Sequence, residues 1–214
     1  MIFMEESGYQ GKSSLRWAMV LAIIFLISGC SSSKPQPSNT PVLEQNNIPT
    51  VSSQPIAWQS DGTVSNNEYS QFQQIGNLQV FSRIAGDSVY LALRAQNNGY
   101  IALGIKPENK MQGADILICA LNGSQATVTD AYATGPFGPH PADIEIGGTN
   151  DVVQTSGSEQ NGWVTFEFKR KLTTGDSKDK ELTLGDNPVI WASGSSADIS
   201  IHHVNRGYGT LTLK

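Results

Sequence analysis

From residue 56 to the C-terminus, the chain alternates between short runs rich in apolar residues and clusters of turn residues. Within these runs apolar side chains recur at every second position, which is the period of a β-strand with one buried face. The expected strands cover residues 78–85, 88–95, 100–106, 114–121, 125–132, 163–169, 188–193 and 210–214. Because the 3.6-residue period of a helix is not sustained over several turns, the pattern predicts an all-β domain with minor helices.

Turn residues between these runs favour hairpins. Asn-Gly dipeptides stand at 98–99, 122–123 and 161–162, and Gly86-Asp87 separates two further runs. Asn-Gly suits the two-residue turns that join antiparallel strands. With roughly nine or more strands in about 160 residues, we expect residues 56–214 to form an antiparallel, immunoglobulin-like β-sandwich.

The N-terminal region has a different pattern. Residues 17–29 are apolar and follow Lys12 and Arg16, and the run ends in Ile27-Ser28-Gly29-Cys30. Thirteen residues are short for a bilayer span but suit the apolar region of a signal peptide. The ending resembles the lipobox of prokaryotic lipoproteins, in which the peptide is cut before the cysteine and that cysteine is diacylated. The expectation is a signal peptide over 1–29 and lipidation at Cys30, with an uncleaved membrane anchor as the alternative.

The segment that follows Cys30 is rich in Ser, Pro, Asn and Gln up to residue 55. Such a composition cannot bury enough apolar surface to fold, so we expect a disordered linker over 30–55. A flexible chain of about 25 residues spans roughly 25–30 Å on average. The domain is thus expected outside the cytoplasm, in the cell envelope, held close to a membrane by its lipid.

Composition narrows the function. The net charge is −5 and the chain has no basic clusters, which argues against nucleic acid as a partner. Apart from Cys30 the only cysteine is Cys119, within an apolar run, where a small buried side chain is the simplest interpretation. A single remaining thiol predicts neither a zinc site nor a disulfide framework.

Three groups of segments resemble the DOMON domain family, and the resemblance runs over almost all of residues 56–214. They are Asp61-Gly62 with Glu68-Tyr69; residues 110–116 (KMQGADI) with Asp130-Ala131-Tyr132 and Pro141-Ala142-Asp143; and residues 168–176 with Val189-Ile190-Trp191-Ala192 and residues 202–207 (HHVNRG). The order and spacing of these groups make the resemblance specific, and it implies a β-sandwich of the DOMON type.

One branch of this family binds b-type haem through one Met and one His, and another lacks that pair and is associated with sugars or with protein contacts. The resemblance implies that Met111 and either His202 or His203 are the axial ligands. The spacing to Arg206-Gly207 favours His202, and adjacent histidines on a strand would point to opposite faces, so that only one reaches the iron. Arg206 is expected to pair with a haem propionate or with a backbone carbonyl. Because the chain has no CxxCH motif, the haem would be non-covalent.

The first functional hypothesis is therefore an extracytoplasmic haem b protein in electron transfer. Its expected partners are a membrane b-type cytochrome or an extracytoplasmic oxidoreductase. The alternative is a non-enzymatic carbohydrate-binding or adhesion module that uses aromatic side chains such as Tyr132 or Phe137. An enzyme is not expected, because the sequence shows no nucleophile–base arrangement, histidine-rich metal motif or phosphate loop.

The remaining candidates have structural interpretations. Trp163 and Trp191 are expected in the core, and His140 in a loop. Asp115, at the start of a strand, is expected to be structural and to fix the Met111 loop. Acid pairs such as Asp143 and Glu145 are common by chance on an acidic domain, so they predict no site.

Overall fold

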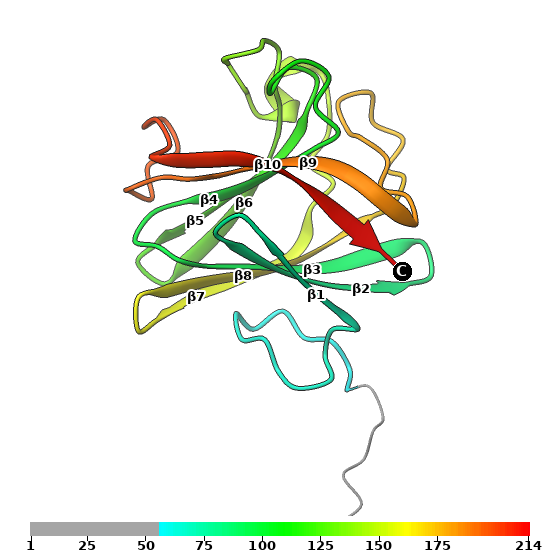
Figure 1. Ribbon diagram of the computed structural model, residues 1–214, viewed down its shortest axis with the longest axis vertical. Helices are drawn as coiled ribbons and strands as arrows, with labels where there is room; N and C mark the ends of the chain where they lie inside the picture. The colour runs from blue at the N-terminus through cyan, green and yellow to red at the C-terminus, as the bar shows by residue number, and fades with distance from the viewer. Residues whose placement is uncertain (1–55) are drawn as a thin grey trace, which may run out of the picture. The chain divides into compact units, whose positions relative to one another are not determined.

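The computed structural model describes residues 56–214, which form two five-stranded antiparallel sheets packed face to face (Figure 1). The first sheet has the order β1-β2-β3-β8-β7 and the second the order β10-β9-β4-β5-β6. The strands are β1 (Gln71–Ile75), β2 (Leu78–Ala85), β3 (Ser88–Gln96), β4 (Ile101–Ile105), β5 (Asp115–Asn122), β6 (Gln125–Tyr132), β7 (Val153–Gln160), β8 (Trp163–Lys171), β9 (Gly185–Ser193) and β10 (Asn205–Leu213). The predicted all-β sandwich is confirmed. The signal peptide, Cys30 and the linker lie outside the described residues.

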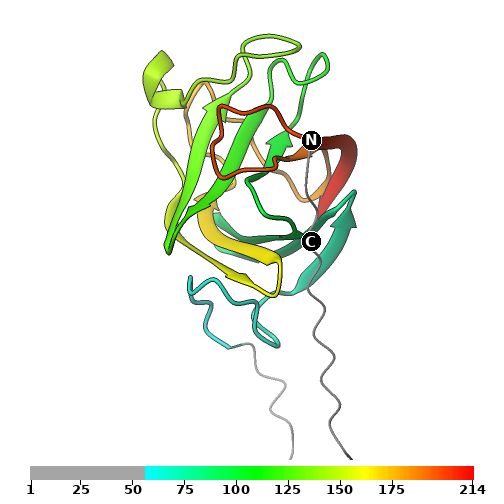
Figure 2. The ribbon, with the colours of Figure 1, turned by 90° about the vertical axis from the view of Figure 1, so that its left-hand side faces the viewer.

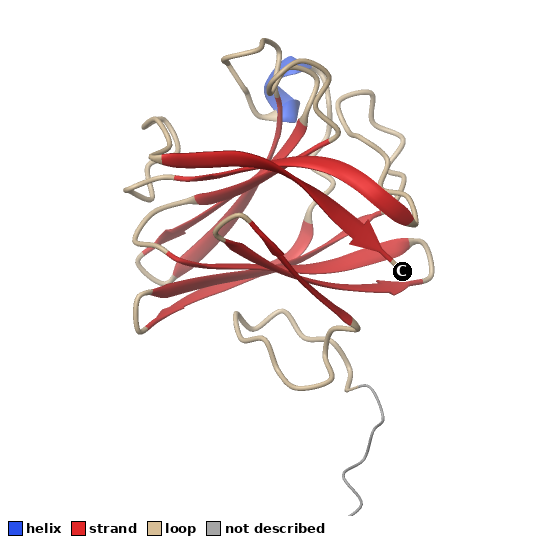
Figure 3. Cartoon of the chain, in the orientation of Figure 1, coloured by secondary structure: helices blue, strands red, loops and turns tan. Residues whose placement is uncertain are grey.

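Helix is minor in the described part, as predicted. A four-residue 3-10 helix, Asp143–Ile146, stands between β6 and β7 (Figure 3, blue). Within residues 56–214 no helix is long and apolar enough to cross a bilayer.

Two strands were not predicted, and both are edges of the first sheet. β1 (QFQQI) and β7 (VQTSGSEQ) are mostly polar. Each pairs on one side only, β1 with β2 and β7 with β8. An edge strand needs fewer apolar side chains than a central strand, so the apolar pattern that reveals central strands is weak in them.

Two of the three Asn-Gly dipeptides lie at hairpins. Asn161 and Gly162 join β7 to β8 with φ of 54° and 74°, the left-handed pair that a type I′ turn requires. Asn122 closes the β5–β6 hairpin. The hairpin expected at Asn98-Gly99 is wrong, because that segment crosses from β3 in the first sheet to β4 in the second.

The main core lies between the sheets and follows strand alternation. Leu91 and Leu93 on β3, with Phe166 and Phe168 on β8, are fully buried and face the second sheet. Cys119 is also fully buried there, as predicted, and burial raises the pKa of its thiol.

The two tryptophans differ from each other. Trp191 is partly buried and packs against the main core as expected. A core position for Trp163 is wrong, because this residue is only partly buried at the start of β8. There the Arg94 guanidinium lies 4.5 Å from the centroid of its ring.

The outer face of the first sheet is covered by the segment 56–70, seen as the cyan loop beneath that sheet in Figure 1. Glu167, an outward residue of β8, fastens this segment. Its carboxylate accepts hydrogen bonds from the backbone N–H groups of Asp61 (3.0 Å), Gly62 (2.7 Å) and Thr63 (3.2 Å), and from the Tyr69 hydroxyl (2.8 Å). One buried side chain thus satisfies four donors of a segment that has no strand of its own.

Replacing Glu167 by Ala should lower the free energy of unfolding by about 2–4 kcal/mol, because hydrogen bonds to a charged acceptor are strong and the buried N–H of Gly62 and the partly buried hydroxyl of Tyr69 would lose their partner. Urea unfolding of the full chain measures this change. Glu159→Ala, which removes an exposed carboxylate from β7, is the control and should leave the unfolding midpoint within experimental error. Equal midpoints for the two variants would contradict this role of Glu167.

Candidate functional site

The outer face of the second sheet is apolar, which is unusual for the solvent side of a sandwich. Eight buried residues form a second hydrophobic cluster on this face, here called the outer-face cluster: Tyr100, Ala102, Ala114, Ile116, Ile118, Ala120, Ala131 and Ala133. β4 (IALGI) is buried at every position, and β5 is buried from Asp115 to Ala120. A strand buried on both faces reads as a continuous apolar run rather than as an alternating one.

Small residues stand at the centre of this face. Ala192 on β9 is paired with Ala102 on β4, which in turn is paired with Ile118 on β5. One step along the strands, Gly104 lies between Ile190 and Ile116. A Cβ at Gly104 would lie 2.6 Å from Cγ1 of Ile190, so the side chains on either side already occupy the space above the glycine.

Met111 lies at the end of this face where β5 begins. Its side chain is partly buried and packs against the outer-face cluster. The loop is held by its backbone, since Met111 O accepts from Ala114 N (3.0 Å) and Gly113 N donates to Ala133 O (2.8 Å). Gly113 has φ 77° and a Cβ there would lie 2.6 Å from Glu108 Cδ, so both the conformation and the close contact favour glycine. In Figure 2 this loop (green) lies at the upper end of the second sheet, the end at which the 3-10 helix also lies.

The two adjacent histidines lie in the loop 194–204 that joins β9 to β10. Their expected position on a strand is therefore wrong, and strand alternation does not decide which of them faces the sheet. Ala197 and Ile199 of this loop pack against the outer-face cluster, as Met111 does. The structure thus brings the Met111 loop and the histidine loop to the same apolar face.

Tyr100 fastens the histidine loop. Its backbone N–H donates to Ser196 O and its carbonyl accepts from Gly194 N, both at 2.9 Å. Its hydroxyl donates to the carbonyl of Ile201, also at 2.9 Å, one residue before His202. A Cβ at Gly194 would lie 2.3 Å from Cε1 of the Tyr100 ring, which shows how closely the loop packs on it.

The histidines differ in exposure, His202 being exposed and His203 partly buried. Burial lowers the pKa of His203, and the positive charge of Arg206 lowers it further. His202 and His140 contribute in the same direction, so all three histidines of the chain lie within electrostatic range of one another. A neutral imidazole is the form that binds a metal ion.

Arg206 is exposed on β10, where it is paired with Ala192. Directly paired residues of antiparallel strands share a face. The guanidinium therefore belongs to the same face as the outer-face cluster, at its edge.

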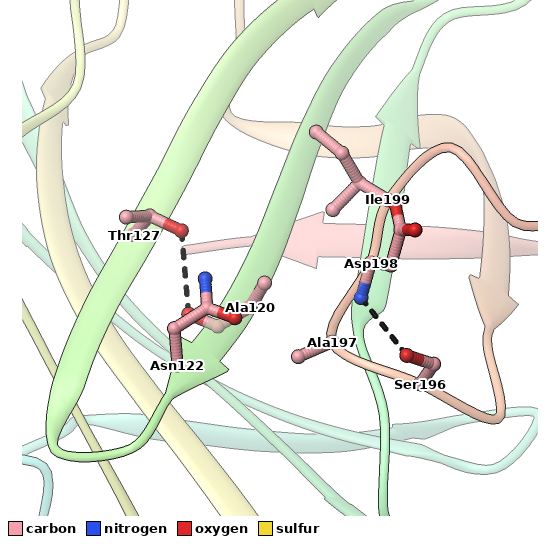
Figure 4. A pocket seen from close by; sticks show the side chains of 7 residues that line it. All are labelled: Ala120, Asn122, Thr127, Ser196, Ala197, Asp198 and Ile199. Atoms are coloured by element: carbon pink, nitrogen blue, oxygen red, sulfur yellow. Dashed lines mark hydrogen bonds between the residues drawn. The ribbon is translucent and has the colours of Figure 1, made fainter.

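A cavity of about 470 Å³ opens between the β5–β6 hairpin and the histidine loop (Figure 4). Its lining consists of Ala120, Asn122, Thr127 and residues 196–199. This volume is within the range of small-molecule sites, which run from about 300 to 1,000 Å³. Met111, His202, His203 and Arg206 do not line this cavity, although its Ala120 belongs to the outer-face cluster.

The DOMON pattern predicts Met111, His202, His203 and Arg206 as site residues, but not the apolar surface that their loops border. Three residues that contribute to this surface were not predicted: Tyr100, Gly104 and Ala192. The sequence signal for such a surface is the uninterrupted apolar runs at 101–105 and 116–120, which indicate strands buried on both faces.

Comparison with known proteins gives a family match. Residues 74–194 match the model of the DOMON domain. Over 133 residues the chain is 28% identical to DBH-like monooxygenase protein 1 of Mus musculus, an alignment that covers 60% of this chain and 21% of the mouse protein. The chain thus spans about a fifth of the length of that relative.

Two solved structures are also similar. The cytochrome b domain of pyranose dehydrogenase from Coprinopsis cinerea has a TM-score of 0.49 at 14% identity, covering 67% of this chain and 80% of that one. The cytochrome domain of cellobiose dehydrogenase from Myriococcum thermophilum has a TM-score of 0.48 at 13% identity, covering 64% and 75%.

Tyr100→Phe should loosen the histidine loop, because it removes the hydrogen bond to the Ile201 carbonyl while the ring stays in place. A net loss of about 0.5–1.5 kcal/mol corresponds to a roughly twofold to thirteenfold rise in local opening. Amide hydrogen exchange of residues 194–204, followed by mass spectrometry, measures it. Tyr208→Phe, on an exposed ring of β10, is the matched control. Unchanged exchange in this loop would show that the hydroxyl does not hold it.

Proposed function

The chain belongs to the DOMON domain family, and on this premise we propose that the outer face of its second sheet binds b-type haem non-covalently for electron transfer. The proposal rests above all on one observation. Met111 and the loop that carries His202 and His203 border the same apolar face, although 91 residues separate Met111 from His202 in the sequence.

The side chains on this face suit a porphyrin. The outer-face cluster consists of alanine, isoleucine and tyrosine, without a charged member. At the middle of the face the paired residues Ala102 and Ala192 present only methyl groups. Ligand sites are mostly apolar, with a few polar groups that fix orientation, and this composition matches that description.

Met111 and one of the two histidines would supply the axial ligands. Met111 is the only methionine after residue 19, and its side chain packs on the outer-face cluster. Of the two histidines, His203 is the better candidate by burial, while the spacing to Arg206 favours His202. Haem ligated by Met and His supplies one-electron transfer at a raised reduction potential.

Arg206 has a further role in this proposal. It is exposed at the edge of the same face, where a propionate of a bound haem would meet solvent. A guanidinium pairs well with a carboxylate because its planar donors match the two oxygens. Pairing with a propionate in this way would orient the haem, while the guanidinium itself would stay outside the apolar contacts of the porphyrin.

The proposed setting is the cell envelope. The apolar run before Cys30 and its lipobox-like ending support export and lipid attachment, and the polar segment that follows supports a tether. A carrier held in this way would exchange electrons with a membrane b-type cytochrome or an extracytoplasmic oxidoreductase.

The carbohydrate alternative has weaker support in the side chains. Phe137 is 78% exposed, but the Lys110 ammonium lies 3.7 Å from the centroid of its ring. The Lys178 ammonium lies 5.6 Å from the centroid of the Tyr132 ring. A sugar that stacked on either ring from that side would have to displace the cation.

Ligand substitutions test the proposal in the full chain loaded with haem. Met111→Ala should convert a six-coordinate, low-spin spectrum into a five-coordinate, high-spin one, because it removes one axial ligand. Met111→His should restore six-coordination and lower the reduction potential, because imidazole replaces the thioether. Optical spectra of the oxidised and reduced forms, with a redox titration, measure both changes.

The histidines are tested separately. Either His202→Ala or His203→Ala, whichever removes the ligand, should sharply reduce haem retention on a desalting column. The His140→Ala variant should retain haem. If Met111→Ala left the spectrum unchanged, or if only His140→Ala released haem, this ligand assignment would be wrong. Loose, broad absorption by the wild-type chain with excess haemin would reject haem binding as such.

A further inference from the structure

A second polar feature lies inside the sandwich, away from the outer face. Arg170 continues the inward row of β8 after Phe166 and Phe168, and Asp115 begins the inward row of β5. Arg170 Nη1 lies 2.6 Å from Asp115 Oδ2, with side-chain exposures of 1% and 0%. This ion pair joins the two sheets at the end of the main core.

Three more carboxyl groups are buried around this pair. Asp130 is on β6, Asp143 on the 3-10 helix and Asp179 in the loop between β8 and β9. Asp130 is 4% exposed, Asp143 is fully buried and the side chain of Asp179 is 2% exposed. Together with Asp115 they form what we call the buried acid cluster, whose four formal negative charges exceed the single charge of Arg170.

Several oxygens of this cluster have no hydrogen-bond partner among the described residues. They are Asp115 Oδ1, Asp130 Oδ1 and both carboxyl oxygens of Asp143 and of Asp179, although Asp179 Oδ2 lies 3.4 Å from Arg170 Nη2. The two remaining oxygens are bonded: Asp115 Oδ2 accepts from Arg170 and from Lys180 N (2.9 Å), and Asp130 Oδ2 accepts from Asp151 N (2.8 Å). Buried polar groups are nearly always satisfied, so these oxygens point to a partner that is not a protein group.

Asp143 supplies an independent observation, because it comes from a separate element and is not needed for the ion pair. Burial raises the pKa of its carboxyl group, and the charges of Asp115 and Asp179 raise this pKa further, while the charge of Lys178 lowers it. It therefore lies within electrostatic range of the other carboxyl groups. A fully buried carboxyl group without any donor is costly unless a cation or a proton neutralises it.

The spacing of the oxygens suits a metal ion. One carboxylate oxygen each from Asp115, Asp130 and Asp179 lie within 4.8 Å of one another. Oxygens bound to one Ca²⁺ at its usual bond lengths lie no more than about 5.2 Å apart. Three oxygens within 4.8 Å of one another can therefore bind the same calcium ion.

We propose that the buried acid cluster is a calcium-binding site, with Asp115, Asp130 and Asp179 as ligands and Asp143 as a further carboxylate. All the donors are oxygens, which hard cations prefer, and no histidine or cysteine belongs to the cluster. Calcium accepts six to eight oxygen ligands in flexible geometry, which suits carboxylates from four different elements. The site is independent of haem.

A calcium ion would link four different elements of the domain through their carboxylates. Asp115 and Asp130 belong to the second sheet, Asp143 begins the 3-10 helix and Asp179 belongs to the loop between β8 and β9. Asp115 also follows Met111 by four residues, so an ion here would stiffen the strand from which the Met111 loop emerges. The expected role is structural, because Arg170 and four packed carboxylates leave little room for a substrate.

Protons are the competing occupants of this cluster. Without a cation, burial raises the pKa of Asp130 and of Asp143 to about 7, so protons would neutralise part of the charge. A bound calcium ion and bound protons therefore compete for the same oxygens. Added calcium should stabilise the protein only if the ion binds to these oxygens.

The test uses the full chain, freed of metal with EGTA and then titrated with Ca²⁺ at pH 7.5. Calorimetry should show one site per chain. At about one hundred times its dissociation constant, Ca²⁺ should raise the thermal midpoint by about 5–10 °C. Mg²⁺ at the same concentration should have a much smaller effect.

Variants identify the site. Asp130→Asn and Asp143→Asn should weaken Ca²⁺ binding more than about tenfold, because each removes a charged ligand. Without metal these variants should unfold at the wild-type temperature or above it, because each removes a repulsive buried charge, and this separates a lost site from a lost fold. Glu159→Gln, an exposed carboxylate on β7, should respond to Ca²⁺ as the wild type does.

Two results would overturn the proposal. The first is wild-type protein that shows no binding heat and no change of thermal midpoint at millimolar Ca²⁺. The second is an undiminished calcium response in both Asp130→Asn and Asp143→Asn, which would place the ion elsewhere. Haem retention is measured in the same samples, so failure of either proposed site is seen separately.

Discussion

The described domain depends on one constraint: its second sheet is apolar on both faces. A sheet in a two-layer sandwich needs to bury only one face, and the inward residues of β4, β5 and β9 do so against the first sheet. Their outward neighbours form a second buried cluster, which must also be kept from water. The Met111 loop and the histidine loop both contribute side chains that pack against that cluster.

The sandwich contains two groups of buried charged side chains, and they differ in how well they are paired. On the first sheet, Glu167 is buried by the segment 56–70 and receives donors from that segment, so it is fully compensated. At the end of the core, the single positive charge of Arg170 lies among four buried carboxyl groups and cannot neutralise all of them. A buried charge is retained only where something pairs with it, and this difference separates a structural tie from a candidate ion site.

Much of the fold could be predicted because its signals are local. The alternation in residues 78–85 and the turn at Asn161-Gly162 reveal strands and hairpins without knowledge of the partner strand. β1 and β7 gave no such signal, since edge strands with polar sequences owe their shape to the neighbour they pair with. Asn98-Gly99 has the local sequence of a hairpin turn, but the choice between a hairpin and a crossover between sheets is made by packing far away in the sequence.

Individual residues of the candidate site could be predicted from the sequence, but the apolar surface that they border could not. Met111 and the histidine pair were recognised through the DOMON pattern, whereas Ala102, Gly104 and Ala192 matter only through their register across three strands. Asp143 illustrates the opposite case: its acidic neighbourhood looked like chance composition, yet its carboxyl group is fully buried beside other acids. Burial of a single polar residue depends on which loops cover it, and local sequence carries little information about that.

The central claim is that the apolar outer face holds haem between a thioether and an imidazole. X-ray absorption at the iron edge of the haem-loaded full chain tests this most directly, because it reports the elements bound to the metal. One sulfur is expected among the six nearest atoms of the iron, and this sulfur should be lost in Met111→His. A coordination shell of nitrogen and oxygen alone in the wild-type protein would contradict it.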